Sequence, residues 1–310
     1  IGNSQEDSYL NSFVTSKFGI KDILISGNQI YASYVEEIKK DGFNTSILKA
    51  EISDSLIFEK FFSTDQYIDK NFKEFYPIQS GGRIVEYGKD SVLFSVGDYR
   101  YRVKAQDSNS INGKILSINK FDQNYRIVSM GHRNAQGLDY LEDGNYIIST
   151  EHGPSGGDEV NFNSQINSLS NFGWPISSYG IHYDLENAKN DNHSPDLKRR
   201  IKNAPLYKSH SDHGFIEPIK YFDQNPGISE VKFVKNNDDE VEFIVATLGT
   251  ILTRPYIKSL LHMKYNIKEN KTELIEDYIV NGRVRDLIIE NGMVWYSEES
   301  RGTIGSFKLN

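Results

Sequence analysis

One pattern recurs five times along this chain: two runs of alternating apolar residues separated by a short polar turn. Such alternation places apolar side chains on one face of a strand, and an intervening Asn-Gly or Asp-Gly pair favours a tight hairpin. The copies lie at residues 22–34, 83–96, 137–149, 231–245 and 285–297. The pattern therefore predicts a chain that is built from β-hairpins.

The spacing of the copies distinguishes between two all-β architectures. The copies recur at roughly 50 to 60 residues, with one longer interval, and this period is typical of propeller blades with four strands each. A β-sandwich with several hairpins is the alternative, but its strands recur at about 8 to 12 residues throughout. We therefore predict an all-β, six-bladed-type β-propeller as a single domain over residues 22–310, after an irregular lead-in at residues 1–21.

The longer interval, about residues 150–228, is rich in glycine, proline and polar residues. Long insertions on a rigid scaffold are usually functional, because the scaffold positions them while leaving their sequence free to vary. We expect this loop insertion to contribute to a functional site.

Composition excludes several classes of function. The chain has 310 residues, no cysteine and a net charge of −8. The lack of cysteine excludes disulfide scaffolds, thiolate zinc sites and cysteine nucleophiles, and the scattered lysines and arginines argue against nucleic-acid binding. No apolar run approaches the ~18 residues of a membrane span. The first residue is Ile1 and not Met, which suggests that a leading segment has been removed.

Three segments give the strongest functional signal. Residues 131–137 read GHRNAQG, residues 151–161 read EHGPSGGDEVN, and residues 171–175 read NFGWP. In this order and spacing they resemble the soluble quinoprotein glucose dehydrogenase and aldose sugar dehydrogenase (glucose/sorbosone dehydrogenase) family, whose segments read GHRNPQG, EHGPxGGDE and NYGWP. The resemblance covers about residues 22–310. It implies that a further N-terminal blade, normal in the family, is absent or shortened here.

The resemblance implies a cofactor and a reaction. Pyrroloquinoline quinone (PQQ) would lie over the mouth of the propeller, take a hydride from C1 of an aldose to give a lactone, and pass the electrons to an external acceptor. The carbonyl oxygens of Gly153 and Pro154 would hold a Ca²⁺ ion, which prefers oxygen ligands and acts as a Lewis acid. Arg133 and Asn134, supported by Gln136, would donate hydrogen bonds to the quinone oxygens.

Two arginines near the C-terminus have two interpretations. Arg283 and Arg285 alternate, so they project to the same face of a strand and could bind the carboxylates of the cofactor. The alternative is a surface ion pair with Asp286 or Glu290.

By the same resemblance, Glu159 and the carbonyl of Phe172 form a second, structural calcium site, while Asp158 caps or orients the loop. The alternative is an acidic pair that is merely solvated. The histidines of this region show no zinc-binding spacing, so we expect each to be a hydrogen-bonded loop residue; they are His132, His152 and His182.

Two positions depart from the family pattern. The general base of the family is a histidine in a His-x-Gly-Gly-Arg run, whereas residues 79–83 read QSGGR and place Gln79 at that position. A glutamine amide cannot take up a proton near neutral pH. Asp98, which would orient the histidine, is left without that partner. The turn that carries a cofactor-binding lysine in the family is matched by residues 246–249, which contribute no positive charge.

These departures leave two hypotheses. The first is a PQQ- and calcium-dependent sugar dehydrogenase whose proton transfer is impaired, unless His213 or His262 reaches the position of the base. The second is a non-catalytic propeller that keeps the calcium loop as a binding or interaction module. The family resemblance also implies a periplasmic or secreted location.

Overall fold

The structure is a computed structural model that describes residues 19–183, 195–237, 239–249, 258–299 and 302–309. The chain divides into two compact units, residues 1–135 and 136–310, and each is described by itself. Of the predicted lead-in, residues 1–18 lie outside the described part, and the first strand begins at Ile20.

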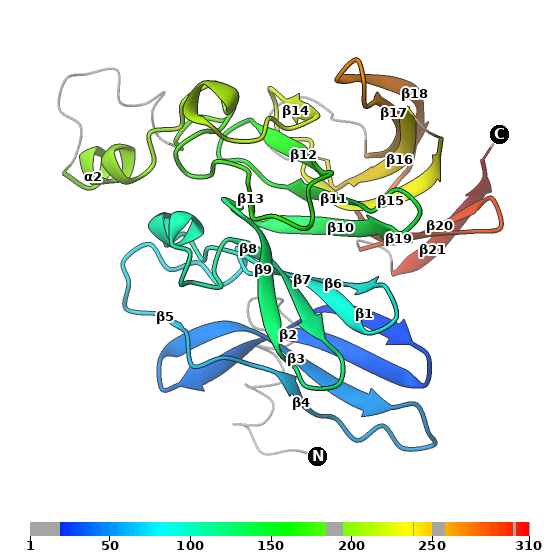
Figure 1. Ribbon diagram of the computed structural model, residues 1–310, viewed down its shortest axis with the longest axis horizontal. Coiled ribbons are helices and arrows are strands. Elements are labelled where there is room, and N and C mark those ends of the chain that lie inside the picture. Colours follow the sequence, from blue (N-terminus) through cyan, green and yellow to red (C-terminus); the bar gives the residue numbers. More distant parts are fainter. Residues whose placement is uncertain (1–18, 184–194, 238, 250–257, 300–301, 310) are drawn as a thin grey trace. The chain divides into compact units, whose positions relative to one another are not determined.

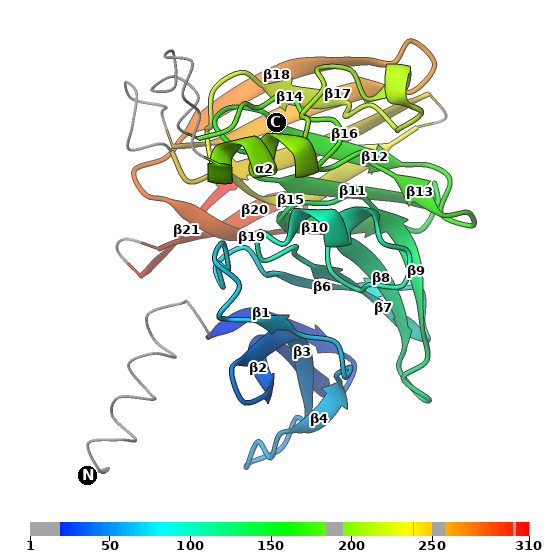
Figure 2. The same cartoon turned by 90° about the vertical axis from the view of Figure 1, so that its left-hand side faces the viewer.

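The first unit contains two antiparallel sheets in which strands adjacent in sequence pair with one another (Figure 1). In the first sheet the order is β1-β2-β3-β4, with β5 paired to β3, and in the second sheet β6 to β9 follow one another. Figure 2 shows the first sheet as a strongly twisted blue layer. The elements are β1 (Ile20–Ser26), β2 (Gln29–Lys39), β3 (Gly42–Glu51), β4 (Glu59–Phe62), β5 (Ile68–Asp69), β6 (Gly81–Tyr87), β7 (Ser91–Val96), η1 (Arg102–Gln106), β8 (Lys114–Asn119) and β9 (Tyr125–Met130).

The second unit contains three sheets, with strand orders β10-β11-β12-β14, β15-β16-β17-β18 and β19-β20-β21. Most of the predicted insertion lies between β12 and β14 and contains the helical segments of this unit. The elements are β10 (Ala135–Leu141), β11 (Tyr146–Glu151), β12 (Asp158–Asn163), β13 (Ser170–Asn171), α2 (Pro195–Asn203), η2 (Ser211–His213), β14 (Lys220–Phe222), β15 (Ile228–Asn236), β16 (Glu240–Thr247), β17 (Ser259–Asn266), β18 (Lys271–Ile279), β19 (Val284–Glu290), β20 (Met293–Glu298) and β21 (Thr303–Lys308). No helix in the described ranges is long and apolar enough to cross a membrane.

All five predicted hairpins are confirmed, and each forms the first two strands of a sheet. Two-residue turns close the first and the last of them: Ser26 pairs with Gln29, and Glu290 pairs with Met293. The glycines of these turns adopt positive φ, as the Gly-Asn and Asn-Gly sequences predict. The described residues form five sheets, so a six-bladed count is not confirmed.

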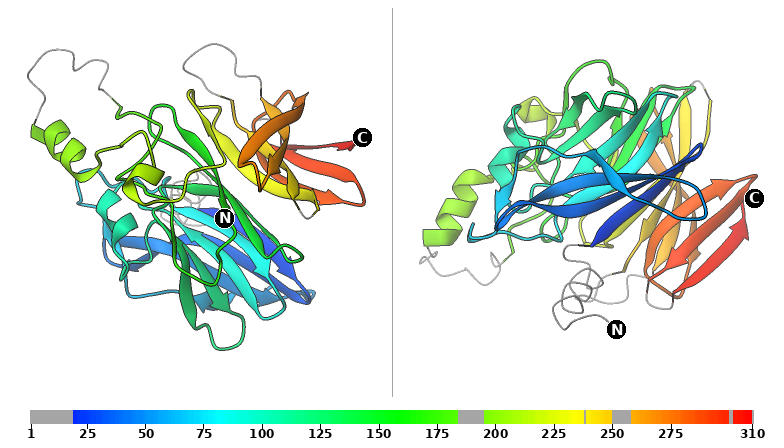
Figure 3. Two further views of the ribbon diagram at one scale, coloured as in Figure 1. Left: turned by 45° about the horizontal axis from the view of Figure 1, so that its top comes forward. Right: turned by 90° about the horizontal axis from the view of Figure 1, so that it is seen from below.

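Apolar side chains hold neighbouring sheets together within each unit. In the first unit Tyr31, Phe62 and Phe94 belong to one buried cluster between the two sheets. In the second unit the alternate residues of β16 supply two clusters, because Phe243 packs toward β11 and β12 while Ile244 packs toward β19 and β20. Figure 3 shows the yellow-to-orange and red sheets of this unit lying side by side. A strand buried on both faces reads as an apolar run, as β16 does.

Buried hydroxyl groups repeat at the contacts between sheets. In the first unit, Ser33 on β2 donates a hydrogen bond to the carbonyl of Gly82 on β6. In the second unit, Thr150 on β11 donates to the carbonyl of Ser229 on β15 at 2.6 Å. The Ser229 hydroxyl in turn donates to the carbonyl of Val284 on β19 at 2.6 Å. These bonds pair buried side-chain donors with backbone carbonyls of the neighbouring sheet.

Acidic residues, one buried and one half-buried, make a second set of contacts between sheets. Asp22 on β1 accepts a hydrogen bond from the backbone N–H of Ile84 at 2.8 Å and pairs with Arg83 at 3.0 Å. In the second unit, Asp139 on β10 accepts from the backbone N–H of Phe233 on β15 at 2.8 Å. Because these contacts are directional, they fix how one sheet lies along the next, which apolar packing alone does not.

We expect Thr150→Val to lower the free energy of unfolding by about 1 kcal/mol. The substitution keeps the shape of the side chain but leaves the buried Ser229 carbonyl without its donor. Urea denaturation followed by circular dichroism measures the change. The matched control is Thr303→Val on the exposed β21, whose hydroxyl contacts only the Glu298 carboxylate at 3.3 Å. Equal losses for the two variants would show that the buried hydroxyl contributes nothing specific.

Candidate functional site

Four of the predicted site residues lie together in the first unit, although they come from three separate sequence motifs. The side-chain amide of Gln79 donates to Asp98 Oδ1 at 2.6 Å, and the backbone N–H of Asp98 donates to the carbonyl of Arg133 at 3.0 Å. The backbone N–H of Gly81 donates to Asn134 Oδ1 at 3.0 Å. All four side chains are buried: they belong to Gln79, Asp98, Arg133 and Asn134. The loops before β6, after β7 and before β10 therefore meet at one place.

Glycines allow these loops to approach so closely. A Cβ atom on Gly97 would lie 2.4 Å from the carbonyl oxygen of Gln79, which is closer than any real contact. Gly81 has φ +63°, a conformation that favours glycine, and its N–H contacts Asn134. The close packing of the backbone around the Gln79–Asp98 pair therefore explains why glycines occur in the runs at residues 81–82 and 96–98.

The Gln79–Asp98 pair sets the chemistry at this position. Asp98 Oδ1 also accepts from the backbone N–H of Arg100 at 2.8 Å, so the carboxylate is held by two donors. A carboxylate only accepts hydrogen bonds, which requires the NH₂ group of Gln79 to face it. Asp98 therefore has a partner, contrary to the expectation that the loss of the histidine had left it alone. The amide oxygen of Gln79 remains as an acceptor, but it is not a base.

A buried lysine close to these loops gave no signal in the sequence. Lys114, the first residue of β8, is fully buried, and its Nζ donates to the carbonyls of Lys104, Ala105 and Asn112 at 2.8, 2.9 and 2.9 Å. Burial lowers the pKa of Lys114 to about 7, and the carboxylate of Asp107 offsets this effect only in part. Three carbonyl acceptors match the three donors of an ammonium group, so Lys114 joins η1 to β8.

In the second unit, Asp158 organises the predicted calcium loop. Its Oδ1 accepts from the backbone N–H of Gly153 at 3.0 Å, and its Oδ2 accepts from that of Gly227 at 2.9 Å. The predicted orienting role of Asp158 is thereby confirmed. Burial raises the pKa of this carboxyl, with His152 acting in the opposite direction. The loop is also packed against itself, since a Cβ atom on Gly153 would lie 2.2 Å from the carbonyl oxygen of Gly157.

The carbonyl groups of this loop provide oxygen donors for a cation. The Pro154 carbonyl accepts from Asn225 Nδ2 at 3.0 Å, and Asn225 Oδ1 is buried without a hydrogen-bond partner. Calcium takes 6 to 8 oxygen ligands, including backbone and amide carbonyls. An unpartnered amide oxygen beside Pro154 therefore fits the ion predicted at Gly153 and Pro154. Among the described residues there is no group of three or more histidine or acidic side chains that could hold a metal.

The second predicted calcium position contains a histidine that the sequence did not indicate. His210 Nδ1 lies 2.9 Å from the carbonyl oxygen of Phe172, and His210 Nε2 lies 3.5 Å from Glu159 Oε1. The second distance is that of an ion pair and not of a well-directed hydrogen bond. Burial raises the pKa of Glu159, and Glu159 raises the pKa of His210 against the opposing effect of burial.

The two C-terminal arginines share one carboxylate. Arg283 Nε lies 2.9 Å from Glu299 Oε2, and Arg285 makes two hydrogen bonds to Glu299, at 3.0 and 3.1 Å. Their partial exposure means that this cluster contributes little to stability. Glu299 was not among the predicted partners. Gln136 lies half-buried on β10.

The three loop histidines are hydrogen-bonded, as predicted. His132 Nε2 lies 2.7 Å from Ser129 Oγ. His152 Nε2 lies 2.7 Å from the carbonyl oxygen of Ile228, and His182 Nε2 lies 2.8 Å from that of Ala204. These contacts account for each imidazole without a metal.

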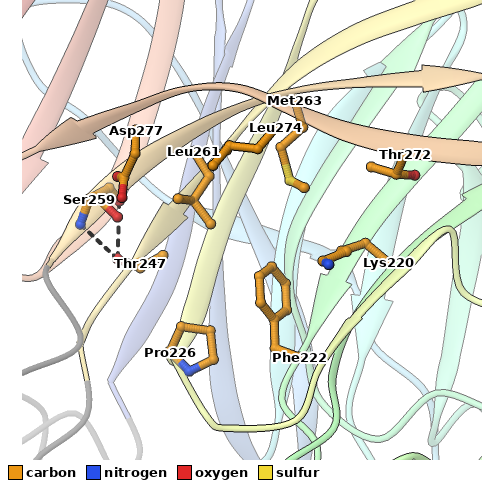
Figure 4. Close-up of a pocket in the computed structure, with 10 residues that line it drawn as sticks. All are labelled: Lys220, Phe222, Pro226, Thr247, Ser259, Leu261, Met263, Thr272, Leu274 and Asp277. Carbon is orange, nitrogen blue, oxygen red and sulfur yellow. Dashed lines mark hydrogen bonds between the residues drawn. The ribbon is translucent and has the colours of Figure 1, made fainter. Parts of the chain in front are cut away.

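A cavity of about 410 Å³ lies between β14 and the strands β16 to β18 (Figure 4). Its wall is mainly apolar, with Phe222, Leu261 and Met263, and Lys220 and Asp277 add two charges. None of the side chains predicted for the PQQ and calcium sites lines this cavity. In each unit, the candidate functional groups are therefore those of the loops described above.

Known proteins match this chain in sequence and in fold. The profile of the Glucose / Sorbosone dehydrogenase family matches residues 10–305. The chain belongs to this family. Aldose sugar dehydrogenase YliI of Escherichia coli K12 is 28% identical over 170 residues, a match that covers 51% of this chain and 41% of the relative. The chain thus matches less than half the length of this member of the glucose/sorbosone dehydrogenase family.

Solved structures of the family have the same fold. The soluble aldose sugar dehydrogenase of Escherichia coli in its apo-form has a TM-score of 0.65 at 22% identity, covering 92% of this chain and 80% of that one. The PQQ-bound aldose sugar dehydrogenase of Streptomyces coelicolor has a TM-score of 0.63 at 18% identity, covering 94% and 80%. The fold is an all-β propeller, so the prediction of a propeller is confirmed over the sandwich.

Proposed function

We propose that this chain is a PQQ- and calcium-dependent aldose sugar dehydrogenase in which proton abstraction from the sugar is slow. The meeting of Gln79, Asp98, Arg133 and Asn134 supports the proposal most directly. Three motifs of the family, distant in sequence, place these residues within hydrogen-bond contact in one unit. Family membership supports the sugar-oxidising chemistry, and the PQQ-bound relative supports the cofactor.

The residues of the candidate site would have separate roles in binding the cofactor and the ion. PQQ, when bound, would supply the hydride acceptor for C1 of the sugar. Arg133 would supply a buried positive charge, and Asn134, whose side-chain oxygen accepts from Gly81 N–H, would donate to the cofactor through its NH₂ group. The carbonyls of Gly153 and Pro154 would hold calcium, in a loop that Asp158 keeps in place.

The missing function is that of a base. Oxidation of the C1 hydroxyl releases a proton as well as a hydride, and the proton needs an acceptor. Gln79 stands at the position of the family's histidine and directs its amide NH₂ to Asp98. Because a positioned base contributes about 10²- to 10⁴-fold to the rate, its loss leaves a slow enzyme.

The second candidate is a propeller that binds ligands without oxidising them. Two observations favour it: Gln79 cannot act as a base, and Arg283 and Arg285 are both engaged by Glu299. Residues 246–249 also lack the cofactor-binding lysine. In either case we propose that the protein works in the periplasm or outside the cell, as its family resemblance implies.

Titration with PQQ distinguishes the candidates. We expect saturable binding of about one PQQ per chain when calcium is present, measured by isothermal titration calorimetry, and weak dye reduction with aldoses. EDTA should abolish the binding, because the predicted ion holds the cofactor. Arg133→Ala, which removes the buried charge, serves as the control and should weaken binding. Failure to bind PQQ in calcium would exclude the dehydrogenase and leave the binding module.

A further inference from the structure

The imidazole of His210 lies between the two groups that resemble a calcium-binding pair. One ring nitrogen contacts the carbonyl of Phe172 at 2.9 Å, and the other faces the carboxylate of Glu159 at 3.5 Å. His210 is fully buried, and Glu159 and Phe172 are nearly so. Among the described residues, Glu159 Oε1 and His210 Nε2 have no partner that satisfies hydrogen-bond geometry, so the ion-pair contact between them is what compensates each for its burial.

This arrangement does not suit calcium. The ion binds oxygen ligands at 2.3 to 2.6 Å, so any two of its ligands lie within about 5 Å of each other with the ion between them. Here the imidazole ring takes that place, and its nitrogens are not ligands that calcium prefers. The Phe172 carbonyl already accepts a hydrogen bond from the ring.

Neighbouring groups hold His210 in this position. The ring of Tyr179 stacks on the imidazole at 5.5 Å between centroids and 16° between planes, and Tyr179 also stacks on Tyr221 at 3.8 Å. Glu217 accepts hydrogen bonds from the backbone N–H groups of His210 and Ser211 at 2.9 and 2.8 Å. Stacking therefore holds the imidazole ring, and hydrogen bonds hold the backbone of His210. Rotating the side chain out of this position would break several contacts.

We propose that the His210 side chain replaces the structural calcium ion of this position, so that Glu159 and Phe172 bind no metal in this protein. The carboxylate and the carbonyl are joined through the ring and not through an ion. The proposal concerns this position only and is independent of PQQ and of the calcium predicted at Gly153 and Pro154.

Calcium binding by a His210→Ala variant tests the proposal. Removing the ring leaves a buried carboxylate and a buried carbonyl facing a space that an ion and water can enter. We expect the variant to bind one more calcium ion per chain than the wild type, measured by equilibrium dialysis. Its melting temperature should rise by on the order of 5 °C at calcium 100-fold above the Kd of the new site, with no such rise in the wild type.

The matched control is His213→Ala. His213 is the last residue of η2, the short helix that begins directly after His210, and its exposed ring stacks on Tyr207. It should leave the calcium stoichiometry unchanged. If His210→Ala does not fold, His210→Asn, which supplies an amide oxygen, should fold in calcium and unfold on addition of EDTA. A wild-type protein that loses one bound calcium upon Glu159→Gln would overturn the proposal, and so would a His210→Ala variant that gains none.

Discussion

Gln79→His should raise the rate of sugar oxidation by about 10²- to 10⁴-fold, the usual contribution of a positioned base. Asp98 is already held in place by Arg100 N–H and lies 2.6 Å from the amide that the new imidazole would replace. An imidazole that donates one N–H to Asp98 keeps its second nitrogen free to take the proton of the sugar hydroxyl. Dye-linked turnover with several aldoses, in PQQ and calcium, measures the effect.

Two further variants establish the origin of the gain. Gln79→Asn keeps an amide at the position and should show no increase in rate. Adding Asp98→Asn to Gln79→His should remove most of the gain, because the imidazole loses the carboxylate that orients it. If PQQ binds normally and Gln79→His leaves the rate unchanged, Gln79 does not stand at the position of the base.

The hairpins were predictable because their signals are local. A turn such as residues 291–292 and the alternation on either side of it lie within one short stretch of sequence, and the same stretch forms the pair β19 and β20. The number of sheets was not predictable to the same degree. It depends on which later strands join each hairpin, such as β14, which pairs with β12 after a long connection.

In the candidate site, likewise, local features were predictable from the sequence and long-range contacts were not. Gln79, Arg133 and Asp158 belong to short motifs whose glycines and hydrogen bonds shape their own loops. By contrast, Glu299 lies 14 residues from Arg285 and His210 lies 38 residues from Phe172, and no neighbouring residue in the sequence marks either as a partner. Contacts of this kind depend on tertiary packing, so a single sequence indicates which residues matter before it indicates what they contact.

The largest expected effect on stability is that of Lys114→Met, which should lower the free energy of unfolding by about 4 kcal/mol. Methionine fills a similar volume but leaves the buried carbonyls of Lys104, Ala105 and Asn112 without a donor, and each unsatisfied acceptor carries a desolvation cost. Urea denaturation at pH 7 measures the loss. Lys104→Met is the control: its partly exposed side chain pairs with Asp107 at 3.0 Å and lies over the ring of Tyr101 at 6.0 Å, so we expect less than about 1 kcal/mol.

The pH dependence of stability provides an independent test of Lys114. Its pKa is lowered to about 7 in the folded protein, whereas the unfolded chain keeps the ordinary value of 10.5. Between these values the unfolded state binds more protons, so the free energy of unfolding should rise as the pH increases from 7 toward 10. The rise should be absent in Lys114→Met, which has no group to titrate. A rise of equal size in both proteins would assign it to other groups and would show that the three carbonyls keep Lys114 charged throughout.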